Sequence, residues 1–216
     1  MPTTTSSPSP LAGKLVTVFG GTGYIGNYVA QALLSRGARL RLASRAPAKA
    51  QSLKPLANLG QFQLTPCDVT KPDHVAAALE GADYVVNLVG AFAGDLEKLT
   101  GEAPGTIARL AAERHVTALV QISAIGADPA SPTAYARGKA LGEANTLAAF
   151  PKATILRPSI VFGQDDQFIN LFASMIELFP VLPVFGPEAK LQLVHADDVA
   201  EAVVRALEHP ELHGGK

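Results

Sequence analysis

Two side chains that could move a proton stand four residues apart in Tyr135-Ala136-Arg137-Gly138-Lys139. In a helix this spacing places both on one face. An ammonium group beside a phenol lowers the pKa of the phenol, which could then pass a proton to a carbonyl. Ser123, just past a predicted strand, could bind the same carbonyl oxygen. The pattern therefore predicts a reaction centre of Ser123, Tyr135 and Lys139; the alternative is a surface tyrosine and lysine on an amphipathic helix.

A glycine-rich segment follows the apolar run Leu15–Phe19 and reads Gly20-Gly21-Thr22-Gly23-Tyr24-Ile25-Gly26. A continuously apolar run is typical of a buried parallel strand. Glycines at three-residue spacing let the backbone turn sharply and approach a pyrophosphate, whose charge meets free N–H groups at the next helix N-terminus. Because a strand precedes the glycines and helical periodicity follows them, residues 20–26 predict dinucleotide binding rather than a structural turn. Tyr135 and Lys139 would then also contact the nicotinamide ribose.

The residues that choose the cofactor should follow the second predicted strand, 39–43. A site for NAD usually carries Asp or Glu about 20 residues beyond the glycines, bonded to the ribose 2′-hydroxyl. Here Ser44-Arg45 stands at that point, and the first acidic residue of the chain is Asp68. A hydroxyl and a guanidinium group could grip a 2′-phosphate. We therefore predict that NADPH is preferred over NADH.

Further cofactor contacts are expected where the third and fourth predicted strands end. Asp68 could accept a hydrogen bond from the adenine amino group; the alternative role, an N-cap for the helix at Pro72, suits Thr70 better. Gly90 would allow the backbone to approach the adenine ribose closely. The residues predicted to contact the cofactor at these two strand ends are Asp68, Val69, Leu88, Val89 and Gly90.

Strand and helix patterns alternate along the chain, which predicts a parallel sheet with helices on both faces. Strands are expected at 15–19, 39–43, 62–67, 83–89, 118–122 and 154–156, and helices at 23–36, 47–60, 72–80, 105–114 and 133–150. The expected class is α/β, a Rossmann-type doubly wound sheet. We expect a flexible tail over 1–13 and one dinucleotide-binding domain over 14–216, with a substrate or lid segment at about 161–190.

Bulk properties exclude several classes of protein. A net charge of −1 over 216 residues argues against general nucleic-acid affinity. Cys67 is the single cysteine, which excludes an internal disulfide and fits a reducing, cytoplasmic compartment. The first ten residues resemble neither a secretory signal nor a convincing transit peptide. The longest apolar stretch, Leu171–Phe185, is broken by Glu177 and two prolines. It favours core or lid over a partner or membrane surface.

Two acidic clusters could be mistaken for metal or catalytic sites. His195 before Asp197-Asp198 could suggest a metal ligand or a His–Asp relay, but a helix cap at Asp197 and a packing role for His195 are favoured. Asp165-Asp166 is interpreted as a helix start. We therefore predict no metal site.

Together these residues resemble the short-chain dehydrogenase/reductase superfamily, in its extended or atypical branch, over 14–208. Within it the chain is similar to a group formed by the reductase-like accessory subunit of respiratory complex I and its bacterial relatives. The segments that carry this resemblance are Asn87–Gly90, Tyr135–Glu143, Leu156–Gly163 and His195–Ala200. The resemblance implies NADPH binding, with Pro158, Ser159 and Ile160 at the nicotinamide end. Members of the group continue into a C-terminal substrate lobe, so the lobe expected here is small and incomplete.

Three functions follow from these observations. The first is an NAD(P)-dependent oxidoreductase that transfers a hydride to or from a carbonyl, alcohol or quinone-like substrate. The second is a non-catalytic, NADPH-stabilised accessory subunit of the membrane-associated complex I. The third is a redox sensor that reads NADP(H) without chemistry. We expect a cytoplasmic location, with peripheral attachment to the inner membrane face for the second function.

Overall fold

The computed structural model describes residues 8–166, 169–178, 188 and 190–215. A central sheet of six parallel strands has the order β3-β2-β1-β4-β5-β6. The strands are β1 Leu15–Phe19, β2 Arg39–Ser44, β3 Phe62–Pro66, β4 Tyr84–Asn87, β5 Ala118–Ile122 and β6 Thr154–Leu156. The order reverses between β1 and β4, which is the arrangement of a doubly wound dinucleotide-binding sheet. The Rossmann-type prediction is confirmed.

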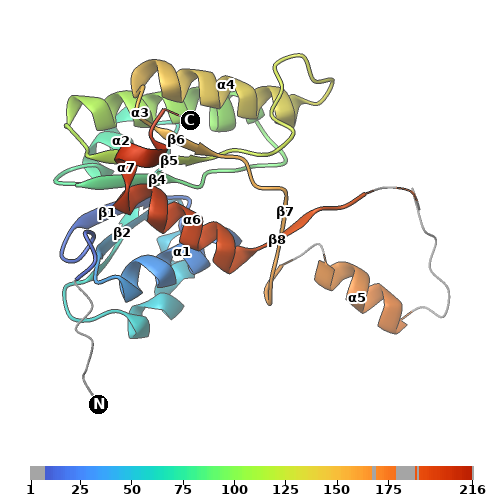
Figure 1. Ribbon diagram of the computed structural model, residues 1–216, viewed down its shortest axis with the longest axis horizontal. Coiled ribbons are helices and arrows are strands. Elements are labelled where there is room, and N and C mark those ends of the chain that lie inside the picture. Colours follow the sequence, from blue (N-terminus) through green and yellow to red (C-terminus); the bar gives the residue numbers. More distant parts are fainter. Residues whose placement is uncertain (1–7, 167–168, 179–187, 189, 216) are drawn as a thin grey trace.

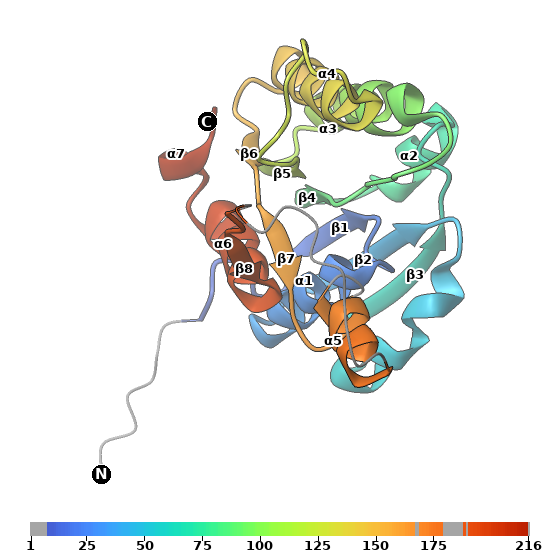
Figure 2. The same cartoon turned by 90° about the vertical axis from the view of Figure 1, so that its right-hand side faces the viewer.

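Helices cover both faces of this sheet (Figures 1 and 2). One face carries α1 Tyr24–Ser35 and α6 Ala196–Glu208; the other carries α2 Pro72–Ala78, α3 Ala103–Glu113 and α4 Ala134–Ala149. Two separate apolar clusters result, one on each face. Because both faces are covered, every residue of β1 and β5 is buried, as their apolar sequences predict.

The helix that carries Tyr135 and Lys139 is held very close to its neighbour. The chain before α3 forms a short π-helical segment, η2 Glu97–Glu102, which packs on α4. A Cβ atom at Gly138 or Gly142 would overlap Thr100, so only glycine fits there. Because η2 leads directly into α3 at Ala103, this helix starts before residue 105, where the sequence predicted its start. The other short helix, η1 Pro47–Leu56, is a 3₁₀ helix that ends before the predicted limit.

A second, two-stranded parallel sheet joins β7 Ile160–Phe162 to β8 Leu193–His195 and was not predicted. Beside it stands α5 Ile169–Leu178, which has no buried residue and lies apart from the two helical layers (Figure 1). The expectation that this apolar stretch forms core is therefore wrong for α5; its use as a lid stays a prediction. Residues 179–185 of the stretch lie outside the described residues. Among the described helices, none is long and apolar enough to cross a membrane.

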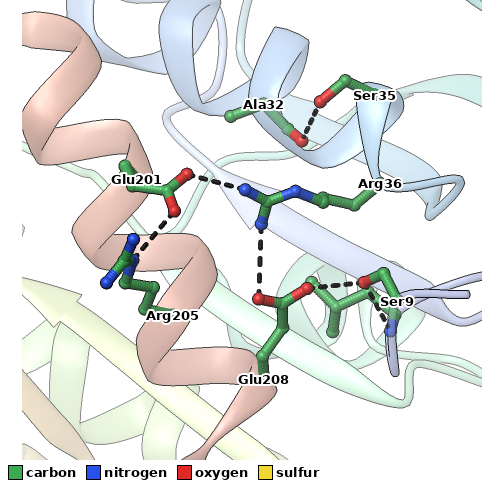
Figure 3. A network of polar contacts seen from close by, with 8 residues as sticks. Ser9, Ala32, Ser35, Arg36, Glu201, Arg205 and Glu208 are labelled. Atoms are coloured by element: carbon green, nitrogen blue, oxygen red, sulfur yellow. Dashed lines mark hydrogen bonds and ion pairs between the residues drawn. The ribbon is translucent and has the colours of Figure 1, made fainter. Parts of the chain in front are cut away.

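The chain before β1 is fixed to the domain from residue 8 onwards. Leu11 is fully buried in the cluster beneath α1 and α6. The Ser9 hydroxyl donates to Glu208 Oε1 at 2.6 Å, and Glu208 also pairs with Arg36 (Figure 3). The predicted flexible tail over 1–13 is thus wrong for 8–13, because burial of one leucine outweighs the polar composition of the segment; residues 1–7 are not described. The short helix α7 Pro210–His213 is the last helix of the described chain.

Candidate functional site

A cleft of about 440 Å³ opens at the carboxyl ends of β1, β2 and β4. This is the edge where ligands of open α/β sheets bind. The predicted cofactor residues that line it are Gly20, Thr22, Gly23, Ser44, Arg45, Val69, Leu88, Val89 and Gly90. Other predicted residues do not line this cleft: Gly21, Tyr24, Ile25, Gly26, Asp68, Ser123, Tyr135, Lys139, Pro158, Ser159 and Ile160.

Close contacts, two with backbone and one with a side chain, explain three of the glycines in the loop. Gly20 has φ +75°, and a Cβ there would lie 3.0 Å from the backbone of Leu88 and Val89. A Cβ at Gly21 would lie 2.6 Å from Leu42 Cδ2, and one at Gly26 would lie 2.5 Å from the Gly21 carbonyl. The glycines thus let the loop fold tightly between β1, β2 and β4.

Gly23 has a different role, since it forms the N-cap of α1 at the cleft wall. It supplies no side-chain cap, and the first turn of α1 contains no acidic residue. The N–H groups at a helix start have no partner within the helix, and the helix dipole favours negative charge there. Because Tyr24 and Ile25 begin this turn, their backbone groups suit a phosphate even though their side chains lie outside the cleft lining.

The wall of the cleft at β2 carries hydroxyl and cationic groups. The hydroxyls of Thr22 and Ser44 lie 2.8 Å apart. Arg45 is exposed at the end of β2, and Lys49 lines the same cleft. The position of Lys49 in the cleft depends on how η1 turns after β2. The residues present can therefore meet a phosphate with two cations.

Asp68 is occupied by a local turn. Its Oδ1 accepts hydrogen bonds from the Thr70 backbone N–H at 3.0 Å and from the Thr70 hydroxyl at 2.8 Å. These bonds, with smaller contributions from nearby Lys71 and Arg45, lower the pKa of Asp68. Thr70 does not cap α2, because the N-cap position falls on Lys71. The role of Asp68 at the adenine stays a prediction.

A buried polar pair supports the turn after β4. Asn87 Nδ2 donates to Gln121 Oε1 at 2.7 Å, and Asn87 Oδ1 accepts from the Val89 N–H at 3.0 Å. Both side chains lie in the sheet interior, where an unpaired amide would be costly. The pair fixes Leu88 to Gly90 against the glycine loop. Sequence reasoning missed this positioning role of Gln121; the available clue was a polar residue inside an otherwise apolar strand.

The three predicted reaction-centre residues come from α4 and from the position directly after β5. Lys139 is 5% exposed, and its Nζ donates to the carbonyls of Ile122 at 3.1 Å and Val89 at 3.4 Å. Burial, opposed by Glu143, lowers the pKa of Lys139 to about 8. Ser123 is 4% exposed, and its hydroxyl has no hydrogen-bond partner among the described residues. A buried hydroxyl without a partner suits a ligand oxygen.

Tyr135 is half-buried at the start of α4 and stacks on Phe92, with ring centroids 5.1 Å apart and planes at 19°. Burial raises the pKa of Tyr135. The expectation that Lys139 lowers this pKa is wrong for the structure, because desolvation dominates and the ammonium group bonds main-chain carbonyls. The Tyr135 phenol therefore keeps its proton at neutral pH.

The buried ammonium group makes a pH-dependent prediction. With a pKa of about 8 in the folded protein and 10.5 in the unfolded chain, Lys139 binds fewer protons when folded across that interval. The free energy of unfolding should therefore rise as the pH increases from about 8 to 10.5, by up to about 3 kcal/mol. Lys139→Met should remove this rise. Urea unfolding of both proteins at pH 7, 8, 9 and 10 measures it; parallel pH curves for parent and variant would refute the burial cost. Lys98→Met, at an exposed position of η2, is the control.

The segment after β6 passes close to Ser123. The Ser123 N–H donates to the Leu156 carbonyl at 2.7 Å, and the Ile125 N–H donates to the Pro158 carbonyl at 3.1 Å. Arg157 holds this segment to α4 through two hydrogen bonds to Glu143, Nε to Oε1 at 2.8 Å and Nη2 to Oε2 at 2.5 Å. Pro158, Ser159 and Ile160 therefore start beside the reaction centre, and their contact with nicotinamide stays a prediction.

The two acidic clusters have structural roles. His195 Nδ1 accepts from the Asp197 N–H at 3.3 Å, so His195 itself caps α6 and the predicted cap at Asp197 is wrong. The packing role of His195 is confirmed by edge-on contacts with Tyr28 and Phe162. Asp166 accepts from the Ile169 N–H at 2.5 Å, consistent with a helix start. In the described part of the chain, no group of three or more His, Cys, Asp or Glu could hold a metal ion.

Comparison with solved structures supports the fold. The chain superposes on the structure of Pen from Bacillus thuringiensis with a TM-score of 0.79 and 18% identity, covering 92% of this chain and 67% of that one. It superposes on WbmG from Bordetella bronchiseptica, solved in complex with NAD, with a TM-score of 0.74 and 15% identity, covering 89% and 68%. At these identities the likeness shows the shared fold.

Curated relatives are similar over nearly the whole chain. Subunit 9 of the NADH dehydrogenase [ubiquinone] 1 alpha subcomplex is 30% identical over 213 residues in Dictyostelium discoideum, covering 96% of this chain and 59% of the relative. The Arabidopsis thaliana subunit is 32% identical over 219 residues, covering 98% and 54%. A ceramide reductase of Caulobacter vibrioides is 26% identical over 202 residues, covering 92% and 62%. The chain thus spans a little over half the length of these relatives.

The model of one family covers the cleft, the reaction-centre residues and the helices of both layers. It matches residues 16–216 and describes an NAD dependent epimerase/dehydratase family. Together with the sheet order and the glycine loop, this match shows that the chain belongs to the NAD dependent epimerase/dehydratase family, within the extended short-chain dehydrogenase/reductase superfamily.

Proposed function

We propose that this chain is an NADPH-preferring oxidoreductase that reduces a carbonyl compound, or oxidises the corresponding alcohol. One observation carries the proposal. Lys139 and Ser123 are both buried at the carboxyl ends of β4 and β5, where the Lys139 ammonium group bonds the carbonyls of Val89 and of Ile122, the residue before Ser123. Burying an ammonium group and an unpartnered hydroxyl lowers the free energy of unfolding. Apolar residues at both positions would make the protein more stable, so we infer that the two polar groups serve to bind a ligand.

The residues present fit a dinucleotide. A Cβ at Gly20 would press on the turn after β4, so the loop leaves the cleft open only with glycine there. Residues 20–26 would hold the pyrophosphate, residues 88–90 the adenosine side, and Pro158, Ser159 and Ile160 the nicotinamide end. A reduced nicotinamide dinucleotide, when bound, supplies a hydride to the carbonyl carbon and is itself oxidised.

The protein's own side chains handle the proton and the substrate oxygen. Tyr135, whose pKa burial raises, transfers its phenolic proton to the carbonyl oxygen as the new C–H bond forms. Ser123 donates a hydrogen bond to the same oxygen. Lys139, with a pKa of about 8, can return a proton to the phenolate from solvent at neutral pH. The alcohol leaves with one hydride and one proton added.

The cationic groups support NADPH as the preferred cofactor. Arg45 and Lys49 line the β2 side of the cleft, and the chain contains no Asp or Glu before Asp68. A 2′-phosphate would gain a charge-assisted hydrogen bond from Arg45, whereas the free 2′-hydroxyl of NADH would find no carboxylate there.

A second candidate is an accessory subunit of complex I that holds NADPH without turnover. The names of the Dictyostelium and Arabidopsis relatives favour it; the Caulobacter relative, named a reductase, favours turnover. An accessory subunit would lie peripherally on the inner membrane face. An enzyme or an NADP(H) sensor would lie in the cytoplasm.

Cell fractionation separates these candidates. We expect the protein in the supernatant after membranes are sedimented, with NADP(H) identified by mass spectrometry in the purified protein. Sedimentation with a membrane complex at low and moderate salt, with bound NADPH that is not consumed, would instead support the accessory role. An empty cleft after purification and no binding on addition of NADPH would contradict both.

A further inference from the structure

The Asn87–Gln121 pair belongs to a larger set of buried hydrogen bonds. The two residues lie opposite each other in the register of β4 and β5, and both are buried. Asn87 Nδ2 donates to Gln121 Oε1 at 2.7 Å, which leaves one polar atom of each amide for a further partner. In Asn87 this atom is Oδ1, and in Gln121 it is Nε2. Both of these atoms bond the main chain at the carboxyl ends of the strands.

Each of these bonds leads to a residue whose carbonyl also holds Lys139. Asn87 Oδ1 accepts from the Val89 N–H at 3.0 Å, and the Val89 carbonyl accepts from Lys139 Nζ at 3.4 Å. Gln121 Nε2 donates to the Ile122 carbonyl at 3.3 Å, and the same carbonyl accepts from Lys139 Nζ at 3.1 Å. The bonds therefore close on themselves. The polar ring consists of Lys139, Val89, Asn87, Gln121 and Ile122.

The two amides decide how firmly the ammonium group is held. A buried ammonium group needs acceptors that stay in place, because the interior offers no water to replace them. Without the Gln121 amide, Asn87 Nδ2 would have no partner in the sheet interior, and the Asn87 side chain would turn to find one. That turn would release the Val89 N–H, and the Val89 carbonyl would no longer be fixed at Lys139.

The pair does more than join two strands. Apart from the two amides, β4 and β5 consist of apolar residues and Tyr84. Replacing both partners of a buried hydrogen bond by apolar side chains of the same shape is nearly neutral, so the sheet itself does not require two amides there. Neither Asn87 nor Gln121 is among the described residues that line the cleft. Their effect on the reaction centre therefore passes through the polar ring to Lys139.

We propose that Gln121 is a positioning residue, which holds the Lys139 ammonium group in place through the polar ring. The role of this group in the reaction rests on the proposed function, in which Lys139 returns a proton to the Tyr135 phenolate. Gln121 itself transfers no proton. Its amide keeps the carbonyls of the polar ring aimed at one point, so the ammonium group occupies the same place in every turnover.

Hydrogen exchange at the Lys139 ammonium group tests this inference without turnover. Protein labelled with ¹⁵N-lysine is studied by NMR at pH 6, where Lys139, with a pKa of about 8, is charged. The signal that is missing in Lys139→Met identifies it. Gln121→Met, which has a similar shape but no amide, should speed exchange of the Lys139 protons with water about two- to tenfold, as expected for one lost hydrogen bond. The exposed Lys98 gives the reference signal in both proteins.

Two more variants separate positioning from a general loosening of the sheet. Thr17→Val removes the buried hydrogen bond from the Thr17 hydroxyl to the Ala78 carbonyl, which lies outside the polar ring. It should leave exchange at Lys139 unchanged. Gln121→Asn keeps an amide but is one methylene shorter, so it opens the polar ring and should speed exchange as Gln121→Met does. Because Gln121→Asn is the milder change, it tests the inference if Gln121→Met does not fold.

Turnover gives a second readout. In Gln121→Met, kcat for reduction of a ketone should fall about two- to tenfold, while kcat/KM for the ketone stays near that of the parent, because the proton is returned after hydride transfer. Unchanged exchange at Lys139 in both Gln121 variants would overturn the positioning role, whether or not the parent reduces a ketone. Faster exchange in a protein that reduces no carbonyl compound would support the positioning role and contradict the proposed reaction instead.

Discussion

Replacing Tyr135 by phenylalanine should reduce kcat about 10²- to 10⁴-fold and leave NADPH affinity nearly unchanged. The substitution removes only the hydroxyl that donates the proton. The ring keeps its stack on Phe92, so the shape of the site is retained. Steady-state loss of NADPH absorbance gives kcat, and a fluorescence titration of the reduced nicotinamide gives the dissociation constant.

Tyr84→Phe is the matched control, because Tyr84 begins β4 at the opposite end of the sheet. Its turnover should equal that of the parent. Equal turnover in Tyr135→Phe and the parent would exclude Tyr135 as the proton donor. A large loss of NADPH affinity in Tyr135→Phe would instead show that the phenol mainly holds the dinucleotide.

Replacing Arg45 by aspartate should reverse the cofactor preference. In the parent, one charge-assisted contact to the 2′-phosphate is worth roughly 1.5–3 kcal/mol, so NADPH should bind about 10- to 150-fold more tightly than NADH. Aspartate repels the phosphate and accepts a hydrogen bond from the free 2′-hydroxyl. Because Arg45 is exposed, higher salt should narrow the preference of the parent. Fluorescence titration with both cofactors measures it.

Two further substitutions show where the effect arises. Lys54→Asp makes the same charge change on η1 but outside the cleft lining, and it should keep the NADPH preference. Lys49→Ser, at a cleft residue, should reduce the preference without reversing it. Equal affinities for NADPH and NADH in the parent would mean that Arg45 is a solvated charge and that the predicted cofactor is wrong.

The parts of the fold that follow from local patterns were predictable. The run 118–122 is apolar except for Gln121 and forms β5 at the predicted bounds, since a strand buried on both faces leaves a largely apolar segment. The helix expected over 133–150 begins after its cap Thr133. Gly37, with φ +75°, follows α1 as predicted.

The parts that depend on distant partners were not predictable. Three-residue strands β7 and β8 pair across about thirty intervening residues, and neither is long enough to show a period. The early start of the helical segment is not evident from the sequence, because glycine and proline usually interrupt a helix. In the structure Gly101 packs against Leu141, and Pro104 lies in the first turn of α3. Similarly, burial of Leu11 depends on α6, near the far end of the chain.

The candidate site divides in the same way. The glycine loop was recognised because its spacing reflects local backbone geometry. Lys139 is buried where α4 meets the ends of β4 and β5, and Tyr135 is partly covered by Phe92; no local pattern records either contact. Lys49 and Gln121 were missed because their roles depend on how η1 turns and on the side-chain pair between β4 and β5.

Transfer of deuterium from the cofactor to a ketone tests the central claim most directly. The protein, in molar excess over NADPH that carries deuterium at both C4 positions of the nicotinamide, is mixed with acetophenone, and the product is analysed by mass spectrometry and chiral chromatography. Hydride transfer within the site predicts 1-phenylethanol with deuterium on the carbinol carbon, predominantly as one enantiomer, formed about 10²- to 10⁴-fold more slowly with Tyr135→Phe. Saturable NADPH binding with no deuterated alcohol from any carbonyl compound tried would contradict the proposed catalysis and leave a protein that holds the dinucleotide without turning it over.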